Sequence, residues 1–168
     1  MKYVLPLIGF ILLAQFTGLI GSYFAFPAIN TWYADLHKPF FTPPNWIFGP
    51  VWTTLYIFIG IAAFLVYKKG FIVLQGSKEL QKKRKRAAKE GLSVFGFQLA
   101  VNSLWSILFF GFKSPLFGFI GIILLWIASG VTIQRFARVS FAAAFLQLSY
   151  IFWVTFILML NLAILLLN

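Results

Sequence analysis

The 168-residue chain has no cysteine, one histidine (His37) and three acidic residues. The lack of cysteine excludes a disulfide framework, a cysteine-ligated zinc site, an iron–sulfur cluster and a thiol nucleophile. The three acids, Asp35, Glu79 and Glu90, leave little for a metal site or for paired-carboxylate catalysis. Charged residues make up only 10% of the chain, against about 25% in soluble domains, which excludes a soluble globular enzyme.

What the chain does have is long apolar sequence. Hydrophobic residues make up 61% of it, and the mean hydropathy is +0.92, which is too apolar for a disordered chain. A membrane-spanning helix needs about 20 mostly apolar residues. The sequence therefore predicts one all-α domain over residues 1–168, a bundle of five transmembrane helices at about Tyr3–Ala25, Trp46–Tyr67, Leu92–Phe112, Pro115–Arg135 and Ser140–Leu166. Pro27 is expected to end the first span.

The basic residues indicate how these spans are oriented. With five spans, 12 of the 14 Lys and Arg residues share one side: Lys2, nine between Lys68 and Lys89, Arg135 and Arg138. Only Lys38 and Lys113 lie opposite. The positive-inside rule then predicts a cytoplasmic N-terminus and an external C-terminus. Between two spans, the run Lys82–Arg86 is interpreted as a topology signal that meets anionic headgroups, in preference to a nucleic-acid site.

Polar, aromatic and small residues gather on single faces of several spans. The spacings are those of one helix face for four sets: Gln98, Asn102 and Trp105; Trp52 and Tyr56; Gln147, Tyr150, Trp153 and Asn161; and Ala14, Gly18, Gly21 and Ala25, with Ser22 beside them. Such polar groups face the bundle interior, because lipid cannot satisfy them. Two interpretations stay open, interhelical hydrogen bonding and a cavity for a flat, largely apolar ligand.

Residues 26–45 form the most distinctive connection. The segment is rich in proline and aromatic residues, which predicts a stiff lid over the mouth of a cavity. Asp35 and Lys38 are spaced for an ion pair if the segment has a helical turn, worth about 0–1 kcal/mol at a surface. Tyr3, Trp46 and Tyr67 are expected in the aromatic belts at the membrane interfaces.

Three sequence runs together resemble the TspO/MBR family of tryptophan-rich sensory and translocator proteins, also known as peripheral-type benzodiazepine receptors. The longest carries Trp32-Tyr33, Leu36, Lys38-Pro39 and the run Pro43–Tyr56. The others are Gln98–Ser106 in the third span and Trp153–Phe156 with Leu160-Asn161 in the fifth. The resemblance covers essentially the whole chain.

The resemblance implies a five-helix bundle in a bacterial cell membrane, usually a homodimer, with a pocket under the first loop. It implies tetrapyrrole ligands such as protoporphyrin IX and haem, isoquinoline-carboxamide and benzodiazepine-type drugs, and no required cofactor. The role implied is that of a sensor, regulator or transporter in tetrapyrrole and stress signalling. The ligand-binding residues carried over are Trp32, Trp52, Tyr56, Asn102, Trp105 and Trp153, with Ser22 and Asn161 as further candidates.

The chain departs from the family pattern at three places. Phe40-Phe41 replaces a frequent tryptophan, Ser149 replaces a frequent proline, and no Lys or Arg follows Tyr150, where a sterol-recognition pattern would need one. Sterol binding is therefore not expected of this chain, although Leu65–Lys69 fits the same weak pattern.

Three other functions stay open at this point. One is light- and oxygen-dependent porphyrin degradation through tryptophan radicals, with Trp52 and Trp153 as the catalytic pair that the resemblance implies. A binding protein without turnover is favoured, because the sequence offers no acid–base or nucleophile–base pair. His37 as an axial haem ligand and a small transporter are weaker hypotheses, since a lone loop histidine is usually solvated and no inverted repeat is found.

Overall fold

The computed structural model describes residues 3–73 and 76–168, and it is built from five long helices. These are α1 (Val4–Ile29), α3 (Asn45–Tyr67), α4 (Lys78–Ser106), α5 (Pro115–Ala137) and α6 (Phe141–Leu167). A short helix, α2 (Trp32–Asp35), lies in the first connection, and the π-helical turns η1 (Lys68–Ile72) and η2 (Ile107–Gly111) extend α3 and α4. The five long helices are each long and apolar enough to cross a membrane, which confirms the predicted five-helix fold. Lys2, counted in the topology argument, lies outside the described residues.

Two helix boundaries differ from the prediction. The helix α1 does not end at Pro27 but continues through it to Ile29. The proline removes the N–H that would bond to the Tyr23 carbonyl, one turn earlier. At the helix end the Thr31 hydroxyl donates to the Pro27 carbonyl at 2.8 Å. The helix α4 begins at Lys78, well before Leu92, because Lys, Arg and Glu are good helix formers and Ser77 caps the helix.

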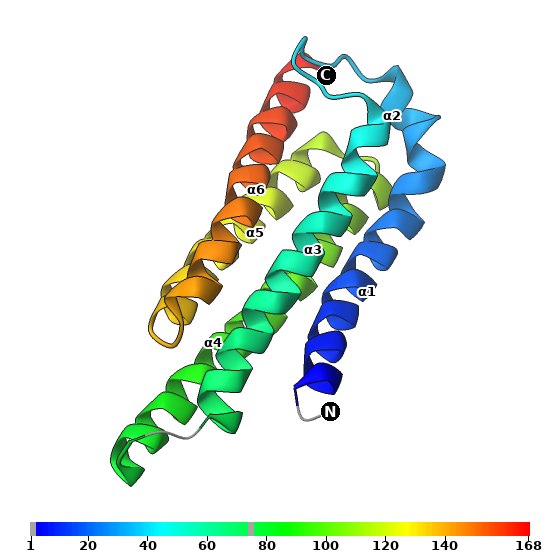
Figure 1. The fold of residues 1–168 in the computed structure, drawn as a ribbon. Coiled ribbons are helices and arrows are strands. Elements are labelled where there is room, and N and C mark those ends of the chain that lie inside the picture. Colours follow the sequence, from blue (N-terminus) through cyan, green and yellow to red (C-terminus); the bar gives the residue numbers. More distant parts are fainter. Residues whose placement is uncertain (1–2, 74–75) are drawn as a thin grey trace.

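The two ends of the bundle are different in character (Figure 1). At one end, called here the loop end, the connection that holds α2 lies beside the final turn of α6. At the other, called the basic end, the start of α4 and η1 project beyond the other helices. The helices α1 and α3 run side by side and antiparallel along the bundle. The site described below lies near the loop end.

Glycines let neighbouring helices approach closely at two levels. At Gly60 of α3, an added Cβ would lie 2.7 Å from the Ile11 Cα, so α1 and α3 are in backbone contact there. Gly118 of α5 packs against the ring of Phe109 in η2. This contact holds α5 close to the end of α4, next to the short connection between them. Small residues allow such close packing between membrane helices, where lipid offers no hydrophobic driving force.

Candidate functional site

A cavity of about 500 Å³ lies inside the loop end, between α1, α3, α4, η2 and α6. This volume is in the range of small-molecule pockets. Its wall is formed by Gln15, Gly18, Leu19, Gly21, Ser22, Ala25, Phe26, Ile29, Asn30, Tyr33, Asn45, Trp46, Phe48, Gly49, Trp52, Thr53, Tyr56, Trp105, Ser106, Phe109, Phe110, Ile157, Leu160, Asn161 and Ile164. Within the described residues the wall carries no charged side chain, so a ligand would be held by aromatic contact and neutral hydrogen bonds.

Aromatic rings form one side of the cavity. The Trp52 ring stacks on Tyr56 with centroids 5.6 Å apart, and it lies 5.8 Å from Trp105, which stacks on Phe109 in turn. The first two residues lie one turn apart on α3, while Trp105 belongs to the last turn of α4 and Phe109 to η2. The π-helical turn places Phe109 and Phe110 together on the cavity wall; such turns often occur at functional sites. This arrangement suits a flat aromatic ligand.

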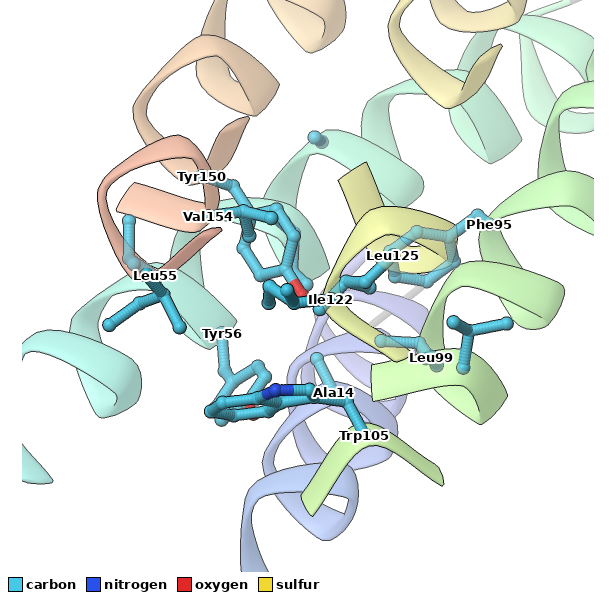
Figure 2. Packing of buried hydrophobic residues seen from close by; sticks show 14 of the residues in the cluster. Ala14, Leu55, Tyr56, Phe95, Leu99, Trp105, Ile122, Leu125, Tyr150 and Val154 are labelled. Carbon is cyan, nitrogen blue, oxygen red and sulfur yellow. The ribbon is translucent and has the colours of Figure 1, made fainter. Parts of the chain in front are cut away.

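Below the rings, polar side chains from α3, α4 and α6 bind one another. The Tyr56 hydroxyl donates to Asn102 Oδ1 at 2.8 Å, and Asn102 Nδ2 donates to the Tyr150 hydroxyl at 2.5 Å. Nearer the loop end, Trp105 Nε1 donates to Asn161 Oδ1 at 3.4 Å. Figure 2 shows Tyr56, Trp105 and Tyr150 converging in the middle of the bundle. These side chains therefore serve interhelical hydrogen bonding, and Tyr56, Trp105 and Asn161 also face the cavity.

The structure brings five of the eight predicted ligand-binding residues into the cavity wall: Ser22, Trp52, Tyr56, Trp105 and Asn161. The other three lie just behind it. Trp32 of α2 packs edge-on against Phe109 at 5.3 Å, Asn102 is buried between two tyrosines, and Trp153 lies edge-on to Trp52 at 6.4 Å. These three support side chains of the wall.

Three buried side-chain polar atoms have no hydrogen-bond partner within the described residues, and they lie at two places. One is Trp153 Nε1, which is enclosed by the rings of Phe48, Trp52 and Phe156. The other is the amide pair Gln98 and Gln147, which share one long bond of 3.5 Å and leave Gln98 Oε1 and Gln147 Nε2 unpaired. Buried polar groups are rarely left unpaired, so each marks a place where a small polar group or a side-chain rotation would be favourable.

Sequence reasoning missed several residues of the wall. Gly18, Gly21 and Ala25, the small-residue face of the first span, border the cavity. An added Cβ would lie 2.5 Å from the Tyr56 ring at Gly18 and 2.9 Å from Ser106 Oγ at Gly21, so the two glycines are also close packing positions. Trp46, expected in an interfacial belt, also lines the cavity, although it is 74% exposed. The sequence signal for these residues is their helical spacing on one face of the first span.

The connection over the cavity is held by backbone hydrogen bonds. Lys38 Nζ donates to the carbonyl groups of Tyr33, Ala34 and Leu36 at 2.7–3.1 Å. The predicted ion pair between Lys38 and Asp35 is therefore wrong, because α2 ends after one turn and its free carbonyls take the ammonium group. Tyr33 lines the cavity, packs on Phe109 and Phe110, and is buried, which raises its pKa to about 12.

His37 lies in the same connection but outside the cavity wall. Its side chain is exposed, and its backbone is bonded to Asn168. Within residues 3–73 and 76–168, no group of three or more His, Cys, Asp or Glu side chains is placed to hold a metal ion. Haem ligation by His37 therefore has no support from the geometry of the cavity.

The chain matches one protein family over nearly its whole length. The TspO/MBR family profile covers residues 10–167. The chain is 43% identical to the tryptophan-rich protein TspO of Archaeoglobus fulgidus, over 98% of each chain. It is 34% identical to the human translocator protein, over 93% of this chain and 86% of that one. It is 31% identical to the tryptophan-rich sensory protein of Cereibacter sphaeroides, over 75% and 70% of the two chains. With five apolar helices long enough to span a bilayer, the chain is an integral multi-pass membrane protein, and it belongs to the TspO/MBR family.

Proposed function

We propose that the protein binds flat, largely apolar tetrapyrroles such as protoporphyrin IX or haem inside the membrane, and acts as a sensor, regulator or transporter for them. The observation that carries this proposal is the cavity of about 500 Å³, with Trp52, Tyr56 and Trp105 on one side and small residues of α1 opposite. A cavity with aromatic rings along one wall fits a planar macrocycle. Neutral hydrogen-bonding groups such as those of Ser22 and Asn161 would orient its polar edge.

The setting proposed for this activity is a bacterial cell membrane, with the basic end in the cytoplasm and the loop end outside. The proposal includes a homodimer, and drugs of the isoquinoline-carboxamide or benzodiazepine type as competing ligands. It requires no cofactor and no sterol. The support comes from the charge asymmetry of the chain and from the family to which it belongs.

A binding titration tests the proposal. Purified protein in lipid nanodiscs is titrated with protoporphyrin IX in the dark, and the porphyrin absorbance shift is followed. Loss of one aromatic stacking contact in Trp52→Ala should weaken binding about 3- to 10-fold. The matched control is Trp126→Ala on α5, whose indole is bonded to Thr155 away from the cavity. Unsaturable binding, or equal weakening by both variants, would overturn the proposal.

A second candidate is light- and oxygen-dependent breakdown of the bound porphyrin. The observation that favours it is the contact between Trp52, which faces the cavity, and Trp153 behind it, at 6.4 Å. An electron would pass from the Trp52 indole to the photoexcited porphyrin, and Trp153 would refill Trp52. Dioxygen would bond to the reduced macrocycle, and the adduct would return the electron to oxidised Trp153 as the ring opens, so that both oxygen atoms end in the product. Light-driven product formation should fall in Trp52→Phe and Trp153→Phe while dark binding persists. Unchanged breakdown in the double variant would leave only the binding function.

A further inference from the structure

We propose that the cavity opens sideways, through a portal between the loop-end halves of α1 and α3, and that the ligand enters through it from the lipid phase of the bilayer. The route follows from the geometry of the cavity. The identity of the ligand rests on the proposed function above. The portal is defined by two edges, Leu19, Ser22 and Phe26 on α1 and Trp46, Gly49 and Thr53 on α3.

The residues of the α1 edge both line the cavity and are exposed on the outer surface of the bundle. Leu19, Ser22 and Phe26 all line the cavity and are all exposed, Leu19 at 67% and Phe26 at 80%. Their spacing of three and four residues places them on one face of the helix. A residue that borders the cavity and is also open to the surroundings lies at an opening, since a residue behind a closed wall would be covered.

The α3 edge has the same character. Trp46, Gly49 and Thr53 line the cavity, are exposed, and repeat the spacing of three and four residues. Because the two helices run antiparallel, Phe26 lies at the level of Trp46, and Leu19 lies at the level of Thr53. An added Cβ at Gly49 would meet no atom within 4 Å, so the space in front of this residue is empty.

The opening ends where α1 and α3 come together toward the basic end. Gln15 Nε2 donates to the Thr53 carbonyl at 3.0 Å and bridges the two helices. Further along, Gly60 brings α3 into backbone contact with Ile11. The open stretch of α1 therefore runs from Leu19 to Phe26, which at 1.5 Å per residue is about 10 Å.

The portal faces lipid. Leu19 lies well inside a helix that is long and apolar enough to span the membrane, and exposed apolar residues such as Phe16 and Tyr23 flank it on α1. Trp46, at the start of α3, lies where a membrane interface is expected. A flat amphiphile dissolved in the bilayer could slide in edge-on, with its polar groups toward the interface. The lack of a charged side chain in the cavity wall agrees with a ligand whose acidic groups stay at that interface.

At the loop end, Asn30 and Asn45 also line the cavity and are exposed, but the connection that holds α2 lies over the cavity beside them. Tyr33 packs on Phe109 and Phe110 across the top of the cavity. Three carbonyls hold Lys38, and Asn168 holds the backbone of His37. These contacts hold the connection over the cavity, whereas none of them lies between α1 and α3.

A labelling experiment tests the route without a tetrapyrrole. The chain has no cysteine, so Ser106→Cys places a single thiol on the buried wall of the cavity. The probe is pyrene maleimide, a reagent that partitions into lipid, added to protein in nanodiscs. Gly49→Phe should slow labelling at least about tenfold, because its ring fills the portal. The matched control is Gly9→Phe on α1, where an added Cβ also meets nothing within 4 Å but the residue is remote from the cavity.

Three outcomes would overturn the portal: labelling that Gly49→Phe leaves unchanged, labelling that is accelerated when Asn168→Ala releases the loop, or a thiol in the Ser106→Cys protein that does not react at all. A titration with protoporphyrin IX separates this inference from the proposed function. Saturable binding with slower association and dissociation in Gly49→Phe than in Gly9→Phe supports both. Portal-dependent labelling in a protein that does not bind porphyrin refutes the ligand and keeps the route.

Discussion

The side-chain amide of Asn168 pairs with the backbone of His37 through two hydrogen bonds. The His37 N–H donates to Asn168 Oδ1 at 3.0 Å, and Asn168 Nδ2 donates to the His37 carbonyl at 2.9 Å. The same Nδ2 donates to the Ile164 carbonyl at 2.8 Å, which orients the amide. A residue after α6 thus fixes the connection between α1 and α3, although 131 positions separate the pair in sequence.

We predict that Asn168→Ala loosens this connection without unfolding the bundle. Each lost hydrogen bond is worth about 0.5–1.5 kcal/mol at most, and the site is exposed, so the melting temperature should fall only slightly. The amide hydrogens of residues 36–38 should exchange much faster, as measured by hydrogen–deuterium exchange. Leu167→Ala, which keeps the amide, is the control. Equal exchange in wild type and Asn168→Ala would show that the pair does not hold the connection.

A second prediction concerns the bond between Tyr56 and Asn102. Tyr56→Phe keeps the ring on Trp52 but leaves the buried Asn102 Oδ1 without its donor. An unsatisfied buried acceptor costs about 1–3 kcal/mol, so the variant should unfold at a lower temperature. Tyr23→Phe, at a tyrosine that is 76% exposed, is the matched control and should change nothing. If the two variants melt alike, the network does not stabilise the bundle.

The span pattern and the polar faces were predictable from sequence, because a lipid environment demands long apolar helices and sends polar groups inward. Helix periodicity correctly predicted that Asn102 and Trp52 face the bundle interior, but it does not show which of them borders the cavity. That depends on which side chains of the opposing helix lie at the same level of the bundle. Here Gly18 of α1 lets the Tyr56 ring approach and Gly21 lets the Ser106 side chain approach, which the pattern of a single helix does not reveal.

Two helix boundaries and one side-chain contact were not predicted, because each depends on more than local composition. Hydropathy predicts which part of a helix lies in lipid, but it does not predict where the helix begins. It therefore does not detect the basic turns of α4 that start at Lys78. Pro27 removes one backbone hydrogen bond from α1, yet the helix continues for two more residues to Ile29. The hydrogen bonds of Lys38 to backbone carbonyls depend on the length of α2, and composition does not predict that length.

The third prediction is a pH dependence that arises from Tyr33. Burial disfavours its phenolate and raises its pKa from the ordinary value of 10.0 to about 12. Between these values the unfolded chain loses a proton that the folded protein keeps, so the stability from this group is complete below pH 10 and falls as pH rises toward 12. Absorbance titrations of wild type and Tyr33→Phe should differ by one late-titrating phenol. A difference that titrates near pH 10 would show that Tyr33 is open to water.

The fourth prediction tests the contact that closes the portal toward the basic end. In Gly60→Ala the new methyl group would lie 2.7 Å from the Ile11 Cα and 3.0 Å from the Phe10 carbonyl oxygen. Both are backbone atoms that cannot rotate away, so α1 must move from α3. Overpacking of this kind costs about 1–3 kcal/mol.

Gly96→Ala on α4 is the matched control, because its added Cβ meets nothing within 4 Å. Replacing a helical glycine by alanine in open space gains up to about 1 kcal/mol in helix propensity, so this variant should be neutral or more stable. Thermal unfolding followed by circular dichroism compares the two. A Gly60→Ala protein as stable as Gly96→Ala would mean that α1 is free to shift against α3. The portal would then have no fixed lower limit at Gln15, and its length would vary with the position of α1.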